Sequence, residues 1–125
     1  MTVAETTILF IYGSLKRGHL NHHRLAGQHY LGDATTEPRY RIVQLGKYGG
    51  LIRDAATGLA VTGELWAVGA TALGELDDFE QGEGLWARSP VAVTARQKVE
   101  AYFWVGDVPD GVRSGAEWPL PGEQV

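Results

Sequence analysis

Short apolar runs separated by glycine or proline dominate the chain, and most of these runs predict β-strands. The first run, from Thr7 to Tyr12, is rich in β-branched residues and stops abruptly at Gly13, as a buried strand does where it enters a turn. Pro38 interrupts the apolar positions between the next two runs. The further extended segments are expected at about His29–Thr36, Arg39–Leu45, Ala60–Val68, Trp86–Thr94 and Val99–Val105.

Two short helices are expected among these strands. Asn21 is a good helix cap and precedes a helical pattern to Ala26. Thr71 is expected to cap a second helix that runs to about Glu80, and Arg96–Lys98 is expected to form a hairpin tip. Many strands with few helices favour an α+β domain built around a small, curled, barrel-like mixed sheet.

Two glycine-containing segments break this pattern. Gly49 and Gly50 mark a place where the backbone must either turn or closely approach another group. Prolines and glycines after Asp107 predict no regular structure, so the segment either lies over the surface, held by Trp118, or is disordered. We therefore expect one domain over residues 1–106 and an irregular tail over residues 107–125.

Composition narrows the possible functions. The 125 residues carry a net charge of −4, which argues against a protein that binds nucleic acid by neutralising phosphates. The pair Lys16 and Arg17 is too small a basic patch to change that conclusion. The chain has no cysteine, which excludes disulfides, thiolate catalysis and cysteine zinc sites. Neither a signal-type N-terminus nor a run of 18 apolar residues is present, so a cytoplasmic protein without a membrane span is expected.

The turn after the first strand is a candidate binding loop. A strand that ends in Gly13 and Ser14 exposes consecutive backbone N–H groups, which bind anions. The residues around Ser14 do not form the G-x-S-x-G nucleophile motif, and Gly13 to Gly18 form neither common nucleotide-binding motif. A backbone role for this loop is therefore favoured over nucleophilic or nucleotide chemistry.

Glu80 is the candidate acid/base. It lies seven residues after Leu73 and four after Leu76, on the apolar face of the second predicted helix. Partial burial, the negative end of the helix and the nearby charge of Asp77 would each raise its pKa toward neutrality. In the alternative reading the helix has frayed by this point and Glu80 is an ordinary exposed side chain.

Other polar and aromatic residues have simpler explanations. His19, His22 and His23 could in principle hold a metal, but a solvated helical turn explains them better, and no metal is expected. Arg88 is expected to pair with an acidic neighbour. The strand aromatics are expected to form core or pocket wall; they are Trp66, Trp86, Tyr102 and Trp104.

Three segments together resemble the γ-glutamylcyclotransferase-like (AIG2-like) family. They are Tyr12–Gly18, Gly63–Trp66 and Leu76–Glu80. Their order and spacing match the family over about residues 7–105. The continuation Lys16-Arg17-Gly18 and the short chain look most like the γ-glutamylamine cyclotransferase branch.

The resemblance implies a small mixed-sheet barrel with two or three short flanking helices. It also implies an enzyme that releases 5-oxoproline from a small γ-glutamyl amine without metal or cofactor, as a monomer or weak homodimer. Glu80 would be the catalytic acid/base. The implied substrate-binding residues are Tyr12, Gly13, Ser14 and Leu15 in the loop, Gly49, Gly50 and Leu51 opposite it, and Trp86.

Trp86 departs from the family, which usually has tyrosine at this position. An indole offers only an N–H donor where a tyrosine offers a hydroxyl, so the identity of the leaving amine stays open. Two alternatives also stay open. One is a non-catalytic binding module for an acidic metabolite. The other is a cyclotransferase for glutathione or γ-glutamyl-amino acids, although the longer loop typical of glutathione enzymes is missing.

Overall fold

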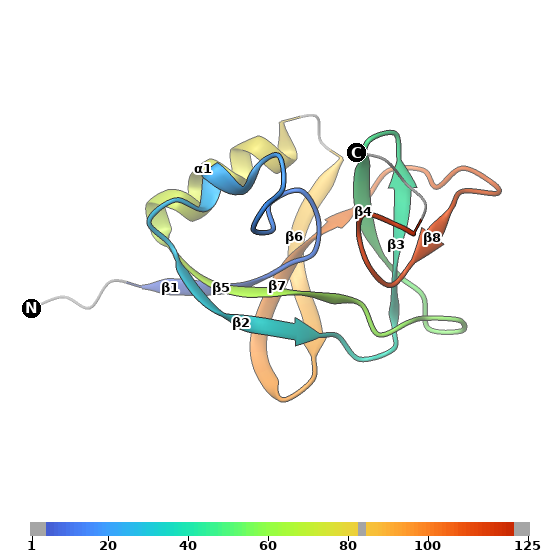
Figure 1. Cartoon of the computed structure of the whole chain (residues 1–125), viewed down its shortest axis with the longest axis horizontal. Coiled ribbons are helices and arrows are strands. Elements are labelled where there is room, and N and C mark those ends of the chain that lie inside the picture. Colours follow the sequence, from blue (N-terminus) through green and yellow to red (C-terminus); the bar gives the residue numbers. More distant parts are fainter. Residues whose placement is uncertain (1–4, 83–84, 122–125) are drawn as a thin grey trace, which may run out of the picture.

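A computed structural model describes residues 5–82 and 85–121, which form an eight-stranded, curled mixed sheet with one α-helix and one 3-10 helix (Figure 1). The strands lie in the order β2-β5-β1-β7-β4-β3-β8, and β6 pairs with the other side of β7. The elements are β1 (Thr6–Ile11), η1 (His22–Leu25), β2 (His29–Thr35), β3 (Tyr40–Leu45), β4 (Tyr48–Arg53), β5 (Thr62–Gly69), α1 (Ala70–Gln81), β6 (Trp86–Val93), β7 (Arg96–Trp104) and β8 (Ser114–Gly115).

The sheet divides along β7, and this division positions the candidate site. One edge of β7 pairs with β6 over most of its length. The other edge pairs first with β1, where Ile8 faces Val99, and then with β4, where Leu51 faces Phe103. Both of these pairings are parallel. The loop that follows β1 therefore leaves the sheet at the point where β7 changes partner.

The core lies on both faces of β1. Leu9, Phe10 and Ile11 are all at most 2% exposed, and successive side chains of a strand point to opposite faces. Phe10 packs into the cluster between β1, β4 and β7, whereas Leu9 and Ile11 pack into the cluster under α1. Figure 1 shows α1 and η1 together over the β1–β5 side, with the β3–β4–β8 lobe beside them. The predicted buried strand and the predicted curled α+β fold are confirmed.

The two predicted helices differ from expectation at their starts. The helix near Asn21 is a four-residue 3-10 helix, and the Asn21 side chain does not cap it. That side chain donates instead to Ser14 Oγ at 2.9 Å, which ties η1 to the preceding loop. Thr71 lies inside α1, whose N-cap is Gly69, so the predicted cap is wrong.

The β6–β7 hairpin turns earlier than predicted. Its tip is Thr94–Ala95, and Ala95 has a φ of +66°. Arg96–Lys98, expected at the tip, belongs to β7. Polar residues such as these are common in turns. Here they belong to the strand instead, because the pairing of β6 with β7 extends to Arg96, which lies opposite Val93.

The C-terminal segment is more ordered than its composition indicates. Ser114 and Gly115 form β8 against β3, so the prediction of no regular structure is wrong there. Trp118 is buried and its carbonyl oxygen accepts a hydrogen bond from the Lys16 ammonium, in line with the predicted anchoring of this segment. The tail residues 122–125 and the N-terminal residues 1–4 that entered the signal-sequence prediction lie outside the described part of the chain.

The glycine pair lets tryptophan side chains pack closely against the backbone and does not form a turn. Gly49 and Gly50 lie within β4. A Cβ atom on Gly49 would stand 2.4 Å from Trp118 Cδ1, and one on Gly50 would stand 2.8 Å from Trp104 Cβ. Side chains other than hydrogen at these positions would displace both tryptophans. Within residues 5–82 and 85–121, no helix has the length and apolarity needed to cross a bilayer.

Candidate active site

A cavity of about 350 Å³ opens where the sheet divides. The loop after β1 forms one wall, the end of α1 forms another, and aromatic side chains of β4, β6 and β7 complete it. Among the described residues, Glu80 is the one charged residue in its lining. The lining residues are Phe10, Ile11, Tyr12, Gly13, Ser14, Leu15, Leu45, Tyr48, Gly49, Phe79, Glu80, Leu85, Trp86, Tyr102 and Trp104.

Most of the residues expected from sequence lie on this cavity. Glu80, Trp86, Gly49 and the whole loop Tyr12–Leu15 line it. Gly50 and Leu51 do not. Leu51 is fully buried and its backbone N–H is bonded to Tyr12, so its part in the site is to hold the loop rather than to face a ligand.

The Tyr12 hydroxyl joins the two halves of the divided sheet. It donates to the carbonyl oxygen of Tyr102 at 2.7 Å and accepts from the N–H of Leu51 at 3.0 Å. It thus bridges β7 and β4 just beyond the last residue of β1. Burial raises the pKa of this phenol strongly, and the nearby Glu80 adds to the rise. Tyr12 therefore stays neutral and acts as a structural bridge.

Replacing Tyr12 with phenylalanine is expected to lower the free energy of unfolding by roughly 3 kcal/mol. The change leaves a buried N–H and a buried carbonyl without partners, each costing about 1–3 kcal/mol. Urea denaturation of the variant and the wild type measures the difference. Tyr30→Phe is the matched control, because that hydroxyl bonds Asp33 at the exposed surface. An equal loss in both variants would contradict the bridging role.

The loop that follows Tyr12 is held by its own polar contacts. Lys16 N–H donates to Gly13 O at 3.0 Å, and Asn21 bonds Ser14 through both its backbone and its side chain. The N–H groups of Gly13, Ser14 and Leu15 donate to no acceptor within the described residues. Consecutive free N–H groups in a turn suit a carboxylate or an oxyanion. Ser14 Oγ accepts from Asn21, which fits the backbone role predicted for this loop.

Glu64 anchors the far end of the loop. This buried carboxylate accepts from the backbone N–H of Arg17 at 3.2 Å, from Arg17 Nε at 3.1 Å and from Trp66 Nε1 at 3.1 Å. Arg17 also bonds Tyr30 and Asp33. The motif Gly63–Trp66 thus fixes the position of the turn from outside the cavity.

Glu80 lies in the last turn of α1, which extends to Gln81. The helix has therefore not frayed at this residue. The side chain is largely buried, and burial raises its pKa to about 7, while the positive charge of Arg24 acts in the opposite direction. Glu75 and Asp78 are exposed on the solvated side of the helix. A carboxyl group with this pKa is half ionised at neutral pH and can both accept and donate a proton.

Asp77 does not raise the pKa of Glu80, contrary to the sequence-based expectation. Its carboxylate is bound by Arg88 at 2.9 Å through two nitrogens and accepts from the Tyr102 hydroxyl at 2.6 Å. Arg88 also bonds Glu100, so its predicted pairing with an acidic neighbour is confirmed. Hydrogen bonding to Arg88 lowers the pKa of Asp77. The network ties α1 to β6 and β7 behind the cavity.

Several lining residues were missed from the sequence. Tyr48 stands beside Trp86, and Phe79 precedes Glu80. The predicted placement of Trp86, Tyr102 and Trp104 as pocket wall agrees with the lining. Tyr48 carried one signal, since it directly precedes the glycine pair. Nothing in the sequence indicates that residues 45–49 and 104 come together across the sheet division.

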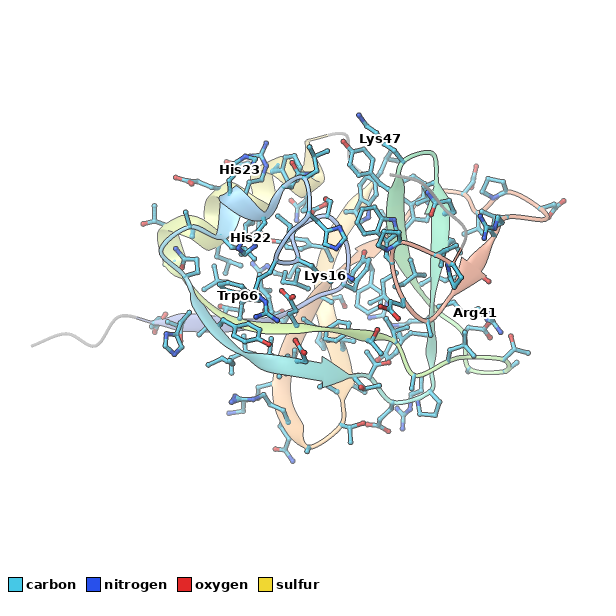
Figure 2. All side chains as sticks on the ribbon, viewed as in Figure 1. Lys16, His22, His23, Arg41, Lys47 and Trp66 are labelled. Atoms are coloured by element: carbon cyan, nitrogen blue, oxygen red, sulfur yellow. The ribbon has the colours of Figure 1, made fainter. Side chains whose placement is uncertain are left out.

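His19 and His22 pack on aromatic rings. Figure 2 shows His22 above Trp66, with ring centroids 5.4 Å apart, and His22 Nδ1 lies 3.0 Å from Leu15 O. The His19 ring lies 5.3 Å from that of Trp118. His23 is exposed, and only this residue matches the solvated turn that was expected.

The cavity thus combines two chemically different walls. The loop offers free N–H donors, and Glu80 faces the same space from the end of α1. Donors of this kind stabilise negative charge on a carboxylate or a carbonyl oxygen. A proton-transferring carboxyl group beside them can serve a reaction in which one nitrogen loses a proton and another gains it.

Comparisons with known proteins agree with the resemblance in the sequence. The family model described as gamma-glutamyl cyclotransferase, AIG2-like, matches residues 9–120. A gamma-glutamylaminecyclotransferase of Homo sapiens is 38% identical over 96 residues, covering 69% of this chain and 61% of that protein. The corresponding Mus musculus protein is 32% identical over 108 residues, covering 79% and 67%.

Across the matched relatives, the aligned region covers between 56% and 67% of the relative's own length. Among solved structures, an AIG2-like protein from Mus musculus superposes with a TM-score of 0.79 at 24% identity, covering 91% of this chain and 88% of that one. At that identity the superposition supports the fold.

Proposed function

This chain belongs to the gamma-glutamyl cyclotransferase, AIG2-like family, and we propose that it releases 5-oxoproline from small γ-glutamyl amines. The observation that carries the proposal is the position of Glu80. A largely buried carboxyl group with a pKa of about 7 faces a loop of unpaired N–H groups across one cavity. Within residues 5–82 and 85–121, no lining residue besides Glu80 carries a charge.

The proposed reaction closes a ring within the substrate. The neutral α-amine of the glutamyl group attacks its own γ-carbonyl carbon, forming the C–N bond of the five-membered lactam. Ionised Glu80 accepts the proton that the attacking nitrogen loses. The protonated carboxyl group then donates this proton to the nitrogen of the breaking amide bond, which departs as a free amine. One group with a pKa near 7 suits both transfers.

The loop would hold the glutamyl group folded for this attack. The N–H groups of Gly13, Ser14 and Leu15 are free to bind the α-carboxylate or the oxygen that becomes negative on the γ-carbon. Because attack is intramolecular, fixing the chain in its folded form supplies much of the rate. The Tyr12 bridge and the Glu64 anchor keep the loop in place on either side.

An amine as leaving group is the finer part of the proposal. Two matched mammalian relatives bear the name gamma-glutamylaminecyclotransferase. A mass-spectrometric screen for 5-oxoproline tests the proposal directly, using γ-glutamyl-ε-lysine, γ-glutamyl-aminoglycosides, γ-glutamyl-amino acids and glutathione. Release from the amines is expected. Binding of these compounds without 5-oxoproline release would instead indicate a binding module.

A further inference from the structure

We propose that Tyr48, Trp86 and Trp104 form the subsite for the leaving amine and select amines on an unbranched alkyl stem that lack a carboxylate beside the nitrogen. This inference rests on the proposed cyclotransferase reaction, and it identifies the residues that determine specificity within it. None of the three touches the reacting atoms in the proposed reaction. They would act by holding the departing group.

The three rings form a corner within the cavity. The ring planes of Trp86 and Trp104 lie at 70° with centroids 4.9 Å apart, and those of Tyr48 and Trp86 lie at 84° with centroids 6.5 Å apart. All three residues line the same cavity as Glu80 and are only partly buried. Rings at steep angles present apolar walls to a chain that lies between them.

The Trp104 ring is held in this orientation. Its Nε1 donates to Asp107 O at 3.0 Å. Gly106 lies so close to the ring that a Cβ atom there would stand 2.6 Å from Cζ2. Gly50 likewise leaves room for the Trp104 Cβ. The corner is therefore a preformed surface, which limits the entropy lost on binding.

The charges around the cavity disfavour an acidic leaving group. No Lys, Arg or His side chain lines it among the described residues. Lys16 bonds Trp118, Arg88 bonds Asp77 and Glu100, and Arg24 lies over Phe79, with its guanidinium carbon 3.7 Å from the ring centroid. Lys47 is exposed at the tip of the β3–β4 hairpin (Figure 2), with its Nζ 5.5 Å from the centroid of the Tyr48 ring, and it is not among the described lining residues.

A carboxylate next to the departing nitrogen would therefore be desolvated near Glu80, with no cationic side chain in the described cavity lining to pair with it. Burying an unpaired charge is costly, and a second negative charge close to Glu80 adds repulsion. A plain alkyl stem has no such cost and gains contact with the three rings. The leaving groups of γ-glutamyl-α-amino acids and of glutathione carry an acidic function near the scissile nitrogen, whereas simple amines do not.

A matched pair of substrates isolates this effect. γ-Glutamyl-pentylamide and γ-glutamyl-norleucine share the same stem and differ by one carboxylate on the carbon bonded to nitrogen. We expect kcat/KM for 5-oxoproline release to be at least about 100-fold higher for the pentylamide. γ-Glutamyl-methylamide, which lacks the stem, is expected to react with a higher KM than the pentylamide.

Variants then test the residues. Tyr48→Ala and Trp104→Phe are each expected to lower the pentylamide-to-methylamide ratio of kcat/KM about tenfold, mainly through KM, because stem contacts are lost. Leu31→Ala, an exposed apolar change on β2, is the control and should leave the ratio unchanged. Because both substrates are assayed with the same preparation of each variant, the ratio of their kcat/KM values does not depend on the fraction of folded protein.

Failure of the subsite proposal and failure of the proposed reaction would give different results. Equal kcat/KM for the pentylamide and norleucine substrates, or unchanged ratios in both aromatic variants, would overturn the subsite while leaving the cyclotransferase proposal intact. Absence of 5-oxoproline from all three substrates would overturn the proposed function and the subsite with it.

Discussion

Glu80→Gln is expected to lower kcat for 5-oxoproline release by about 1,000-fold, since general acid/base catalysis contributes on the order of 100- to 10,000-fold. Glutamine keeps the shape of the protonated side chain but cannot accept a proton from the attacking amine. The cavity lining includes no second charged side chain that could take over the transfer, at least in the part of the chain described. Steady-state assays with mass-spectrometric detection measure the effect.

Glu75→Gln provides the matched control on the same helix. Glu75 is exposed and is not among the residues that line the cavity, so kcat should stay within about twofold of the wild type. Circular dichroism of both variants checks that α1 is intact. A Glu80→Gln enzyme with near wild-type kcat would show that Glu80 is not the proton acceptor. The reaction would then need another group in that role.

The same substitution is expected to stabilise the protein at alkaline pH. The pKa of Glu80 is about 7 in the folded chain, against 4.5 for an ordinary glutamate. Folding therefore favours the protonated carboxyl group. The stability that this group contributes is fully present below about pH 4.5 and is lost as the pH rises through 7. Glutamine, which is neutral at every pH, does not lose it.

Glu80→Gln should accordingly match the wild type near pH 4 and exceed its free energy of unfolding by about 3 kcal/mol near pH 8, because each pKa unit corresponds to about 1.4 kcal/mol. Urea denaturation at a series of pH values measures this difference. Glu75→Gln should show no such trend. A Glu80→Gln variant less stable than the wild type at pH 8 would mean that the ionised carboxylate is stabilised in the fold.

The sequence predicts the loop after β1 and the helix that carries Glu80 better than it predicts how they come together in the site. The apolar run before Tyr12 and the spacing of Leu73, Leu76 and Glu80 are local signals, and both elements form where these signals indicate. The rise in the pKa of Glu80 was also predicted from burial. Asp77 was misjudged because its partner, Arg88, is eleven residues away on β6 and invisible to helix periodicity.

The aromatic corner could not be predicted because it depends on tertiary pairing. Tyr48 and Trp104 come together only because β4 takes over from β1 as the partner of β7. Anchoring by Trp118 was one of two alternatives that the sequence left open, because the residues that contact it, Lys16 and Gly49, are distant in the chain. Asn21 failed as a cap because Ser14, in the adjacent loop, takes its side chain.

The pH dependence of kcat/KM for 5-oxoproline release from γ-glutamyl-ε-lysine tests the role of Glu80 most directly. The carboxylate must be ionised to accept the proton, so activity should fall as the pH drops, with a midpoint near 7, the pKa that burial gives Glu80. An acid limb with its midpoint near 4.5, the value of an ordinary exposed glutamate, would contradict that role.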